Sequence, residues 1–275
     1  MSLLDGKVAI ITGSGRGIGA AAAQLFASEG ASVVVSDLDP APADETAGAI
    51  RQAGGKATVL AGDVTAAEFP KRLIQGTLDA FGGIDIIVNN AGYTWDAVIQ
   101  NMSDQQWEAM LAVHVTAPFR ILREFSNYLR EVAKKEQAAN GRANPRKVVN
   151  VSSVSGVYGN AGQANYSTGK AGITGLTKTL AKEWGRYNVQ VNCVCFGFIE
   201  TRLTASKEQA EKIQREGQEI SLGVPDQMRQ MAPMLIPLGR PGIPEEAAGP
   251  MLFLASPLAN YVSGIVLEVT GGRAV

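Results

Sequence analysis

Tyr166 and Lys170 stand four residues apart in a segment with a helical pattern, so their side chains should share one helix face. A phenol has an ordinary pKa of about 10 and is a poor base at neutral pH. A nearby ammonium stabilises the phenolate and should bring the pKa of Tyr166 toward the working range. The pair therefore predicts proton transfer at a substrate oxygen. The alternative is an ordinary pair on a helix surface.

Serine hydroxyls precede this pair at the end of an apolar, strand-like run. Ser153 can hydrogen-bond a substrate oxygen and stabilise its developing charge. Ser152 and Ser155 are its neighbours and carry the same group.

A glycine-rich turn follows the first predicted strand and leads into an alanine-rich helix. Its sequence is Thr-Gly-Ser-Gly-Arg-Gly-Ile-Gly, and the glycine spacing is Gly-x-x-x-Gly-x-Gly because Ile18 occupies the last glycine position of the general motif. Such a turn lets the backbone approach a pyrophosphate, which the N–H groups and the positive helix end then bind. An ordinary tight turn is the alternative. The candidate ligands of a dinucleotide here are Gly13, Ser14, Gly15, Arg16, Gly17, Ile18 and Gly19.

Two residues bear on the identity of that dinucleotide. Asp37, at the end of the second predicted strand, can accept hydrogen bonds from the adenosine ribose and would repel a 2′-phosphate, which favours NAD. Arg16 could instead bind a 2′-phosphate, which favours NADP. Asp37 could also be a simple turn residue, since it precedes Leu-Asp-Pro. On balance the sequence favours NAD.

Strand-like and helix-like segments alternate along the whole chain. Several strand candidates are nearly continuous apolar runs, which is typical of strands covered on both faces of a parallel sheet. This pattern predicts a single α/β domain over residues 1–275, with a Rossmann-like, doubly wound parallel sheet of about seven strands and helices on both faces. The predicted strands are 8–12, 32–36, 57–61, 84–89, 147–151, 189–194 and 265–269. The predicted helices include 18–29, 43–53, 104–134, 166–186 and 244–255.

Two segments interrupt the alternation. The polar residues 134–147 are interpreted as a solvated extension of a helix. Residues 201–239 form a long polar excursion with several prolines and methionines, and a long loop in a compact domain is often a functional lid. We expect this segment to cover the substrate.

The composition gives little support to charged macromolecular partners. The chain of 275 residues has 25 basic and 26 acidic side chains and a net charge of −1, which argues against a nucleic-acid or anionic-membrane surface. No apolar run reaches the length of a membrane span, and the first residues lack the pattern of a signal peptide. Cys193 and Cys195, two apart in a predicted strand, are expected to be buried thiols. A cytoplasmic location follows as an expectation.

Taken together, these motifs resemble the short-chain dehydrogenase/reductase family, from about residue 5 to residue 272. Thr-Gly-x-x-x-Gly-Ile-Gly at 12–19 resembles its cofactor loop, Asn-Asn-Ala-Gly at 89–92 its motif after the fourth strand, and Phe-Ile-Glu-Thr at 198–201 its nicotinamide segment. Ser153, Tyr166 and Lys170 stand at the family's catalytic spacing, which selects Ser153 among the three serines. The run at 159–166 is especially similar to 3-oxoacyl-carrier-protein reductases, and 3-hydroxyacyl-CoA dehydrogenases are the other similar group.

The resemblance implies transfer of a hydride between a nicotinamide cofactor and a carbonyl or secondary alcohol. Lys170 should then also bind the nicotinamide ribose, and no metal site is expected. Besides the glycine loop and Asp37, the cofactor residues that it implies are Asp63, Val64, Asn90, Ala91, Gly92, Tyr166, Lys170, Gly197, Ile199 and Thr201.

The chain departs from the family's pattern at two positions. His114, the only histidine, stands where the family usually has an asparagine that supports a proton relay to the lysine. Imidazole can donate and accept, so His114 is a candidate supporting catalytic residue; the alternative is a buried helix histidine. Cys195 and Phe196 stand before Gly197 in place of the usual proline, which alters the backbone that should face the nicotinamide.

The substrate is less defined than the reaction. Aromatic residues and the methionines of 201–239 offer apolar surface that suits an acyl chain or a ring; they include Tyr93, Trp95, Tyr158, Phe196, Phe198, Met228, Met231 and Met234. A 3-oxoacyl or 3-hydroxyacyl thioester, carried by coenzyme A or acyl carrier protein, is the first expectation. A steroid, cyclic alcohol or sugar is the alternative, and a non-catalytic cofactor-binding regulator is a third. The resemblance also implies a homotetramer.

Overall fold

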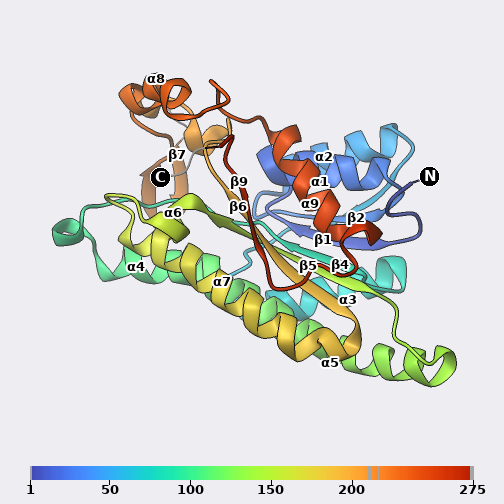
Figure 1. Ribbon diagram of the computed structural model, residues 1–275. Coiled ribbons are helices and arrows are strands. Elements are labelled where there is room, and N and C mark those ends of the chain that lie inside the picture. The colour runs from blue at the N-terminus through green and yellow to red at the C-terminus, as the bar shows by residue number, and fades with distance from the viewer. Residues whose placement is uncertain (1, 210–211, 216, 273–275) are drawn as a thin grey trace.

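Seven of the apolar runs pair side by side as one fully parallel sheet in the order β3–β2–β1–β4–β5–β6–β9 (Figure 1). The computed structural model describes residues 2–209, 212–215 and 217–272. The strands of the sheet are β1 (Val8–Thr12), β2 (Ser32–Ser36), β3 (Lys56–Val59), β4 (Ile86–Asn89), β5 (Arg146–Ser153), β6 (Val189–Phe196) and β9 (Val266–Val269). The predicted doubly wound fold is confirmed, and the strand positions agree to within a few residues.

Alternating side chains of the strands supply two separate cores. In β1, Ala9 and Ile11 pack into one core cluster and Ile10 into the other. All three are completely buried. A strand covered on both faces has no reason to alternate apolar with polar residues, which explains the continuous apolar runs in the sequence.

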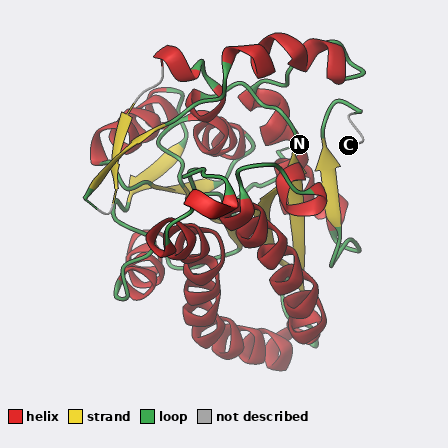
Figure 2. Cartoon of the chain, turned by 90° about the vertical axis from the view of Figure 1, so that its left-hand side faces the viewer, coloured by secondary structure: helices red, strands yellow, loops and turns green. Residues whose placement is uncertain are grey.

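Helices cover both faces of the sheet (Figures 1 and 2). One layer contains α1 (Gly17–Ser28), α2 (Pro40–Gln52) and α9 (Pro244–Ala255), and α1 packs against both of the others. The opposite layer contains α3 (Phe69–Phe81), α4 (Asp104–Leu111), α5 (Ala117–Asn140) and α7 (Ala164–Trp184). Short elements complete the connections: η1 (Ile99–Asn101), α6 (Val154–Tyr158), η3 (Gly185–Tyr187) and η6 (Pro257–Ala259).

The helix predicted over residues 104–134 extends to Asn140 in the structure and is interrupted within its length. It begins at a capping box of Ser103 and Gln106, and a π-helical turn, η2 (Ala112–Thr116), separates α4 from α5. Turns of this kind are rare and often occur at functional sites. His114 lies within this one.

The polar segment 134–147 continues the helix, as predicted, only as far as Asn140, and its last two residues belong to β5. Helix α5 runs to Asn140, and Glu136 accepts two hydrogen bonds, of 2.9 and 2.7 Å, from the guanidinium of Arg146 at the start of β5. The Arg146 side chain is 4% exposed, so the pair holds the end of α5 against the sheet.

The excursion at 201–239 has secondary structure of its own. It contains η4 (Arg202–Thr204), η5 (Lys207–Gln209), an antiparallel hairpin of β7 (Lys212–Arg215) and β8 (Gln218–Ser221), and α8 (Asp226–Leu235). Residues 210, 211 and 216 of the predicted segment lie outside the described residues. The hairpin and α8 stand beside one end of the main sheet (Figure 1).

The two cysteines are free and buried in β6, as expected. Burial raises the pKa of both thiols to about 12. Within the described residues, no helix combines the length and the apolar character needed to cross a membrane.

Candidate active site

The glycine loop between β1 and α1 is shaped by close backbone contacts. A Cβ at Gly19 would collide with the carbonyl of Gly13, so only glycine fits there. Gly17 has a φ of 55°, in the left-handed region, and begins α1. These local requirements explain the glycine spacing in the sequence.

The N-terminus of α1 is suited to bind an anion. Its N-cap residue is Arg16, whose side chain makes no capping hydrogen bond, and the first turn contains no acidic residue. No side chain of the first turn therefore accepts a hydrogen bond from the backbone N–H groups at this positive end of the helix dipole. This is the arrangement in which a helix N-terminus takes a phosphate.

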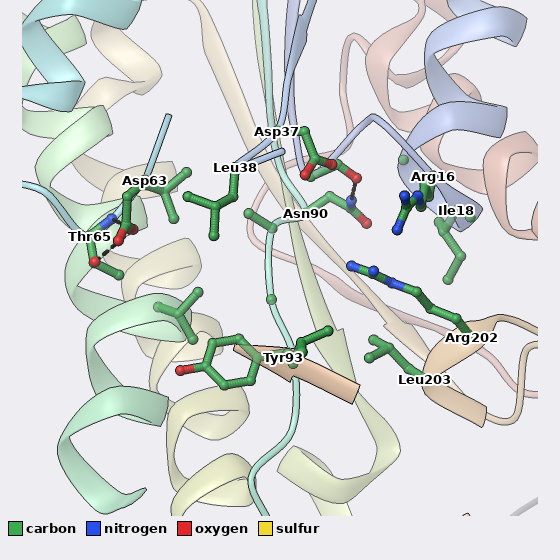
Figure 3. Close-up of a pocket in the computed structure, with 18 of the residues that line it drawn as sticks. Arg16, Ile18, Asp37, Leu38, Asp63, Thr65, Asn90, Tyr93, Arg202 and Leu203 are labelled. Carbon is green, nitrogen blue, oxygen red and sulfur yellow. Dashed lines mark hydrogen bonds between the residues drawn. The ribbon is translucent and has the colours of Figure 1, made fainter. Parts of the chain in front are cut away.

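A cavity of about 510 Å³ opens in front of this loop, a size within the usual range for ligand sites (Figure 3). Most of the predicted cofactor residues line it. They are Gly13, Arg16, Gly17, Ile18, Gly19, Asp37, Asp63, Val64, Asn90, Ala91, Gly92 and Thr201.

Besides Tyr166 and Lys170, four predicted cofactor residues do not line the cavity. Ser14 is buried, and its hydroxyl donates to the carbonyl of Ile11 while accepting from the N–H of Ser36, so it joins β1 to β2. A Cβ at Gly15 would lie 2.9 Å from Asp37, and one at Gly197 would lie 3.1 Å from Thr270. Ile199 is buried and packs against Gly242. Their positions in the structure are those of supporting residues.

The two predicted carboxylates at the cavity are both hydrogen-bonded within the chain. Asp37 accepts from the N–H of Gly15 at 2.9 Å, which ties the end of β2 to the glycine loop. Asp63 accepts from the N–H and hydroxyl of Thr65 at 2.8 and 2.7 Å. Each also lines the cavity, so oxygen atoms are presented there in fixed positions.

Asn90 supports the loop from behind. Its amide donates to the carbonyls of Thr12 and Gly13 at 3.0 and 2.9 Å. The Thr12 hydroxyl accepts from the N–H groups of Asn90 and Ala91, both at 3.1 Å. The motif after β4 thereby holds the glycine loop in place.

Ser153, Tyr166 and Lys170 come together next to this cavity, although they do not line it. Ser153 ends β5, while Tyr166 and Lys170 lie on α7. The ammonium of Lys170 lies 5.7 Å from the Tyr166 ring centroid and donates to the carbonyl of Val151 at 2.9 Å. The neighbouring Ser152 donates its hydroxyl to the carbonyl of Lys170, and Ser155 to Gln163, so both are occupied. Ser153 is the serine whose side chain lies within reach of the Tyr166 hydroxyl.

The expected lowering of the Tyr166 pKa rests on the ammonium of Lys170 and on the positive charge of an oxidised nicotinamide, and the residues of the chain alone do not produce it. Burial raises the pKa of Tyr166 to about 12, and the contact with Ser153 only partly opposes this. Burial also lowers the pKa of Lys170 to about 8. Desolvation is the largest effect on both groups because both lie in the interior, and the charges of Asp96 and Cys195 raise the pKa of Tyr166 further. The phenol is therefore protonated at neutral pH, the state that can donate a proton.

His114 fills a buried space between α7 and the residues after β4. Its ring packs edge-on against Tyr166 at 5.0 Å between centroids, and its Nε2 lies 2.8 Å from the carbonyl of Tyr93. Nδ1 is buried without a hydrogen-bond partner among the described residues, and a Cβ at Gly92 would lie 2.9 Å from it. A Cβ at Gly169 would come within 3.0 Å of the His114 Cβ. Burial, with Lys170 nearby, lowers the pKa of His114 well below 6.5, so the ring is neutral and Nε2 is the donor.

Asn165 is a positioning residue that the sequence analysis missed. Its amide donates to the carbonyls of Trp95 and Gln106, each at 3.0 Å, and its oxygen accepts from the N–H of Tyr166 at 2.8 Å. It is completely buried. The only sign of this role in the sequence is that a polar residue directly precedes Tyr166. The sequence does not show its hydrogen-bond partners, because they lie in distant segments.

The segment 201–239, called the hairpin segment below, closes one side of the cavity with residues that were not predicted to bind the cofactor. Arg202, Leu203 and Ile213 all line it together with Thr201. Ile213, Ile220 and Leu222 form a small apolar cluster against Tyr93 and Trp95. Phe196, expected to face the substrate, belongs instead to a core cluster and is 5% exposed. Met228, Met231 and Met234 are exposed on α8.

Comparisons with known proteins point to a single family. A family model described as short chain dehydrogenase matches residues 7–212. The chain is 38% identical over 272 residues to a 3-oxoacyl-(acyl-carrier-protein) reductase of Thermotoga maritima, with 99% of both chains covered. It is 39% identical to the protein of the same name from Aquifex aeolicus, with 98% of both covered. An uncharacterized oxidoreductase of Mycobacterium tuberculosis is 37% identical, over 100% of this chain and 99% of that protein.

Proposed function

The chain belongs to the short-chain dehydrogenase family, and from that premise we propose that it reduces the 3-oxo group of an acyl thioester with a nicotinamide cofactor. One observation carries the proposal. A protonated Tyr166, held beside Ser153 and Lys170, lies next to a cavity built on an anion-binding glycine loop. The similarity to 3-oxoacyl-carrier-protein reductases over nearly the whole chain supports the choice of substrate.

The cavity fits a dinucleotide. The uncapped end of α1 and Gly17 would receive its diphosphate, Asp37 its adenosine ribose, and Asp63 with Val64 its adenine. Gly92 would flank the nicotinamide end, which is nearest to Tyr93 and His114, and Thr201, beside Gly17, would lie between that end and the diphosphate. When bound, the reduced nicotinamide supplies the hydride to the carbonyl carbon.

The residues of the chain handle the proton and the charge on the carbonyl oxygen. Tyr166 donates its phenolic proton to that oxygen, and Ser153 donates a hydrogen bond that stabilises the negative charge as it forms. Lys170, in its ammonium form, stabilises the phenolate that remains on Tyr166. The phenol of Tyr166 is protonated at neutral pH, which is the state that reduction requires of it.

We propose NAD as the preferred cofactor. Asp37 is held at the cavity by the N–H of Gly15, and its carboxylate would repel a 2′-phosphate on an adenosine ribose bound there. Arg16 lines the same cavity and is the residue that would favour NADP. Initial rates with NADH and NADPH on one substrate decide between them, and a strong preference for NADPH would overturn the role given to Asp37.

The substrate proposal is tested with a panel of acetoacetyl-coenzyme A, acetoacetyl acyl carrier protein, a 3-oxosteroid and a cyclic ketone. Loss of absorbance of the reduced cofactor measures each rate. We expect the two thioesters to react with the highest kcat/KM. A ring ketone that reacts faster than both would favour the alternative of a steroid or cyclic alcohol. The homotetramer and the cytoplasmic location expected from the sequence stay predictions.

A further inference from the structure

Arg202 extends from the hairpin segment into the cofactor cavity. It lies in η4, at the start of residues 201–239, and Figure 3 shows its side chain pointing into the cavity on the same side as Arg16 and Ile18. Two guanidinium-bearing side chains therefore line the cavity from different parts of the chain. Arg16 comes from the glycine loop and Arg202 from the segment beyond β6.

The backbone of Arg202 is held close to the N-terminus of α1. A Cβ at Gly17 would lie 3.5 Å from the Thr201 side chain, so the residue before Arg202 packs over the first position of the helix. The turn is fixed by Thr204, which accepts from the N–H of Thr201 at 2.9 Å and donates to the carbonyl of Ile199 at 2.6 Å. Arg202 is thus anchored at the end of the cavity where the helix favours negative charge.

On the basis of the proposed function, we propose that Arg202 binds the diphosphate bridge of the dinucleotide and thereby ties the segment 201–239 to the bound cofactor. A guanidinium presents its N–H groups in a planar fork that matches phosphate oxygens. Thr201 lies close to Gly17, at the start of α1, and this placement puts the Arg202 guanidinium nearer to the diphosphate than to the ribose at Asp37. The same segment carries Leu203 and Ile213, which also line the cavity. A hydrogen bond from Arg202 to the diphosphate would therefore hold this segment against the bound cofactor.

Equilibrium binding separates this role from the alternatives. The probes are NADH, NADPH, ADP-ribose and adenosine, measured with wild type, Arg202→Gln and Arg202→Lys. We expect Arg202→Gln to weaken NADH, NADPH and ADP-ribose by about tenfold or more, since charge-assisted hydrogen bonds to phosphate are lost. Adenosine, which has no phosphate, should bind unchanged and shows that the pocket is intact. Arg202→Lys should recover part of the affinity.

Lys212→Gln is the matched control, because it removes one positive charge from the same segment on an exposed side chain that pairs with Glu219. Its affinities should stay within about twofold of wild type, since exposed ion pairs contribute little. Cleavage by subtilisin within 201–239 is the second measurement. ADP-ribose should protect the segment in wild type and Lys212→Gln but not in Arg202→Gln.

Each other outcome has a defined meaning. A loss confined to NADPH would assign Arg202 to a 2′-phosphate and overturn the diphosphate role. Unchanged affinity of Arg202→Gln for ADP-ribose, with wild type binding normally, would overturn the inference and leave the proposed function standing. Failure of wild type to bind NADH, NADPH or ADP-ribose would overturn both.

Discussion

The glycine loop and the catalytic helix, which is α7 with the proposed catalytic residues Tyr166 and Lys170, lie at the same end of the sheet. The loop contributes through its backbone and the helix through its side chains. The loop works through its backbone: glycines at 17 and 19 remove side chains, and the N-terminus of α1 presents N–H groups to the cavity. The catalytic helix works through side chains whose charge state depends on burial, above all Tyr166 and Lys170. Substitutions in the loop should therefore affect cofactor affinity, whereas substitutions around Tyr166 should affect turnover.

Tyr166→Phe should show the largest separation of the two effects. Removal of the hydroxyl deletes the proton donor, and we expect kcat to fall by about 10³-fold. The glycine loop is untouched, so the Kd of NADH, measured by fluorescence, should stay within about twofold of wild type. A variant with unchanged kcat would remove Tyr166 from the mechanism.

Gly19→Ala should have the opposite pattern. The new Cβ meets the carbonyl of Gly13, so the loop must shift, at a cost of about 1–3 kcal/mol as for other overpacked sites. We expect weaker NADH binding and a lower free energy of unfolding in urea, with kcat at saturating cofactor close to wild type. Normal affinity in this variant would show that the loop tolerates a side chain and would break the comparison.

His114 tests whether the π-helical turn positions the catalytic helix. His114→Leu removes the donor to the Tyr93 carbonyl and changes the packing against Tyr166, so we expect kcat to fall by roughly tenfold. His114→Asn, which can still donate to that carbonyl, should recover much of the rate. The KM for cofactor should change little in either variant. If His114→Leu and His114→Asn lowered the free energy of unfolding equally and left kcat unchanged, His114 would only pack the core.

The pH profile of kcat/KM for reduction should report Lys170. Its pKa is lowered to about 8, so the ammonium is present below that pH and is lost above it, while Tyr166 stays protonated to about pH 12. We therefore expect a plateau below pH 8 and a roughly tenfold fall for each unit above it. Lys170→Arg keeps its positive charge at these pH values, so the fall should disappear. An unchanged profile in that variant would assign the titration to another group.

Gly48→Ala is the smallest expected effect and the control for Gly19. Gly48 lies within α2, and a Cβ there would meet nothing within 4 Å. Alanine should stabilise the helix by up to about 1 kcal/mol without changing cofactor affinity or turnover. Urea unfolding measures the difference. Destabilisation comparable to that of Gly19→Ala would mean that glycine content in general, rather than the fit at the loop, governs the effect.

The contrast between the backbone of the glycine loop and the buried side chains around Tyr166 also explains which features could be predicted from the sequence. The strands β1 and β2 were predicted to the residue, and the glycine loop was recognised, because apolar runs and glycine spacing are local patterns. The π-helical turn was not, since it depends on how Gly92 and Gly169 leave space for His114. Sequence patterns likewise do not show the burial that raises the pKa of Tyr166.

Residues in irregular segments were the other omission. Arg202 belongs to a segment that was predicted to cover the site, but the direction of its side chain follows from the fixed turn at Thr201 and Thr204. Asn165 was missed because its partners, Trp95 and Gln106, come from segments far along the chain. Such tertiary contacts decide which polar residues support the site.

Transfer of a labelled hydride tests the proposed reaction most directly. Acetoacetyl-coenzyme A is reduced with NADH or NADPH that carries deuterium at the transferred position, and the product is analysed by mass spectrometry and NMR. We predict one deuterium on carbon 3 of the 3-hydroxybutyryl thioester and no label elsewhere, with the hydroxyl proton taken from solvent through Tyr166. Oxidation of the cofactor without deuterium at carbon 3, or no reduction of the thioester at all, would contradict the proposed function.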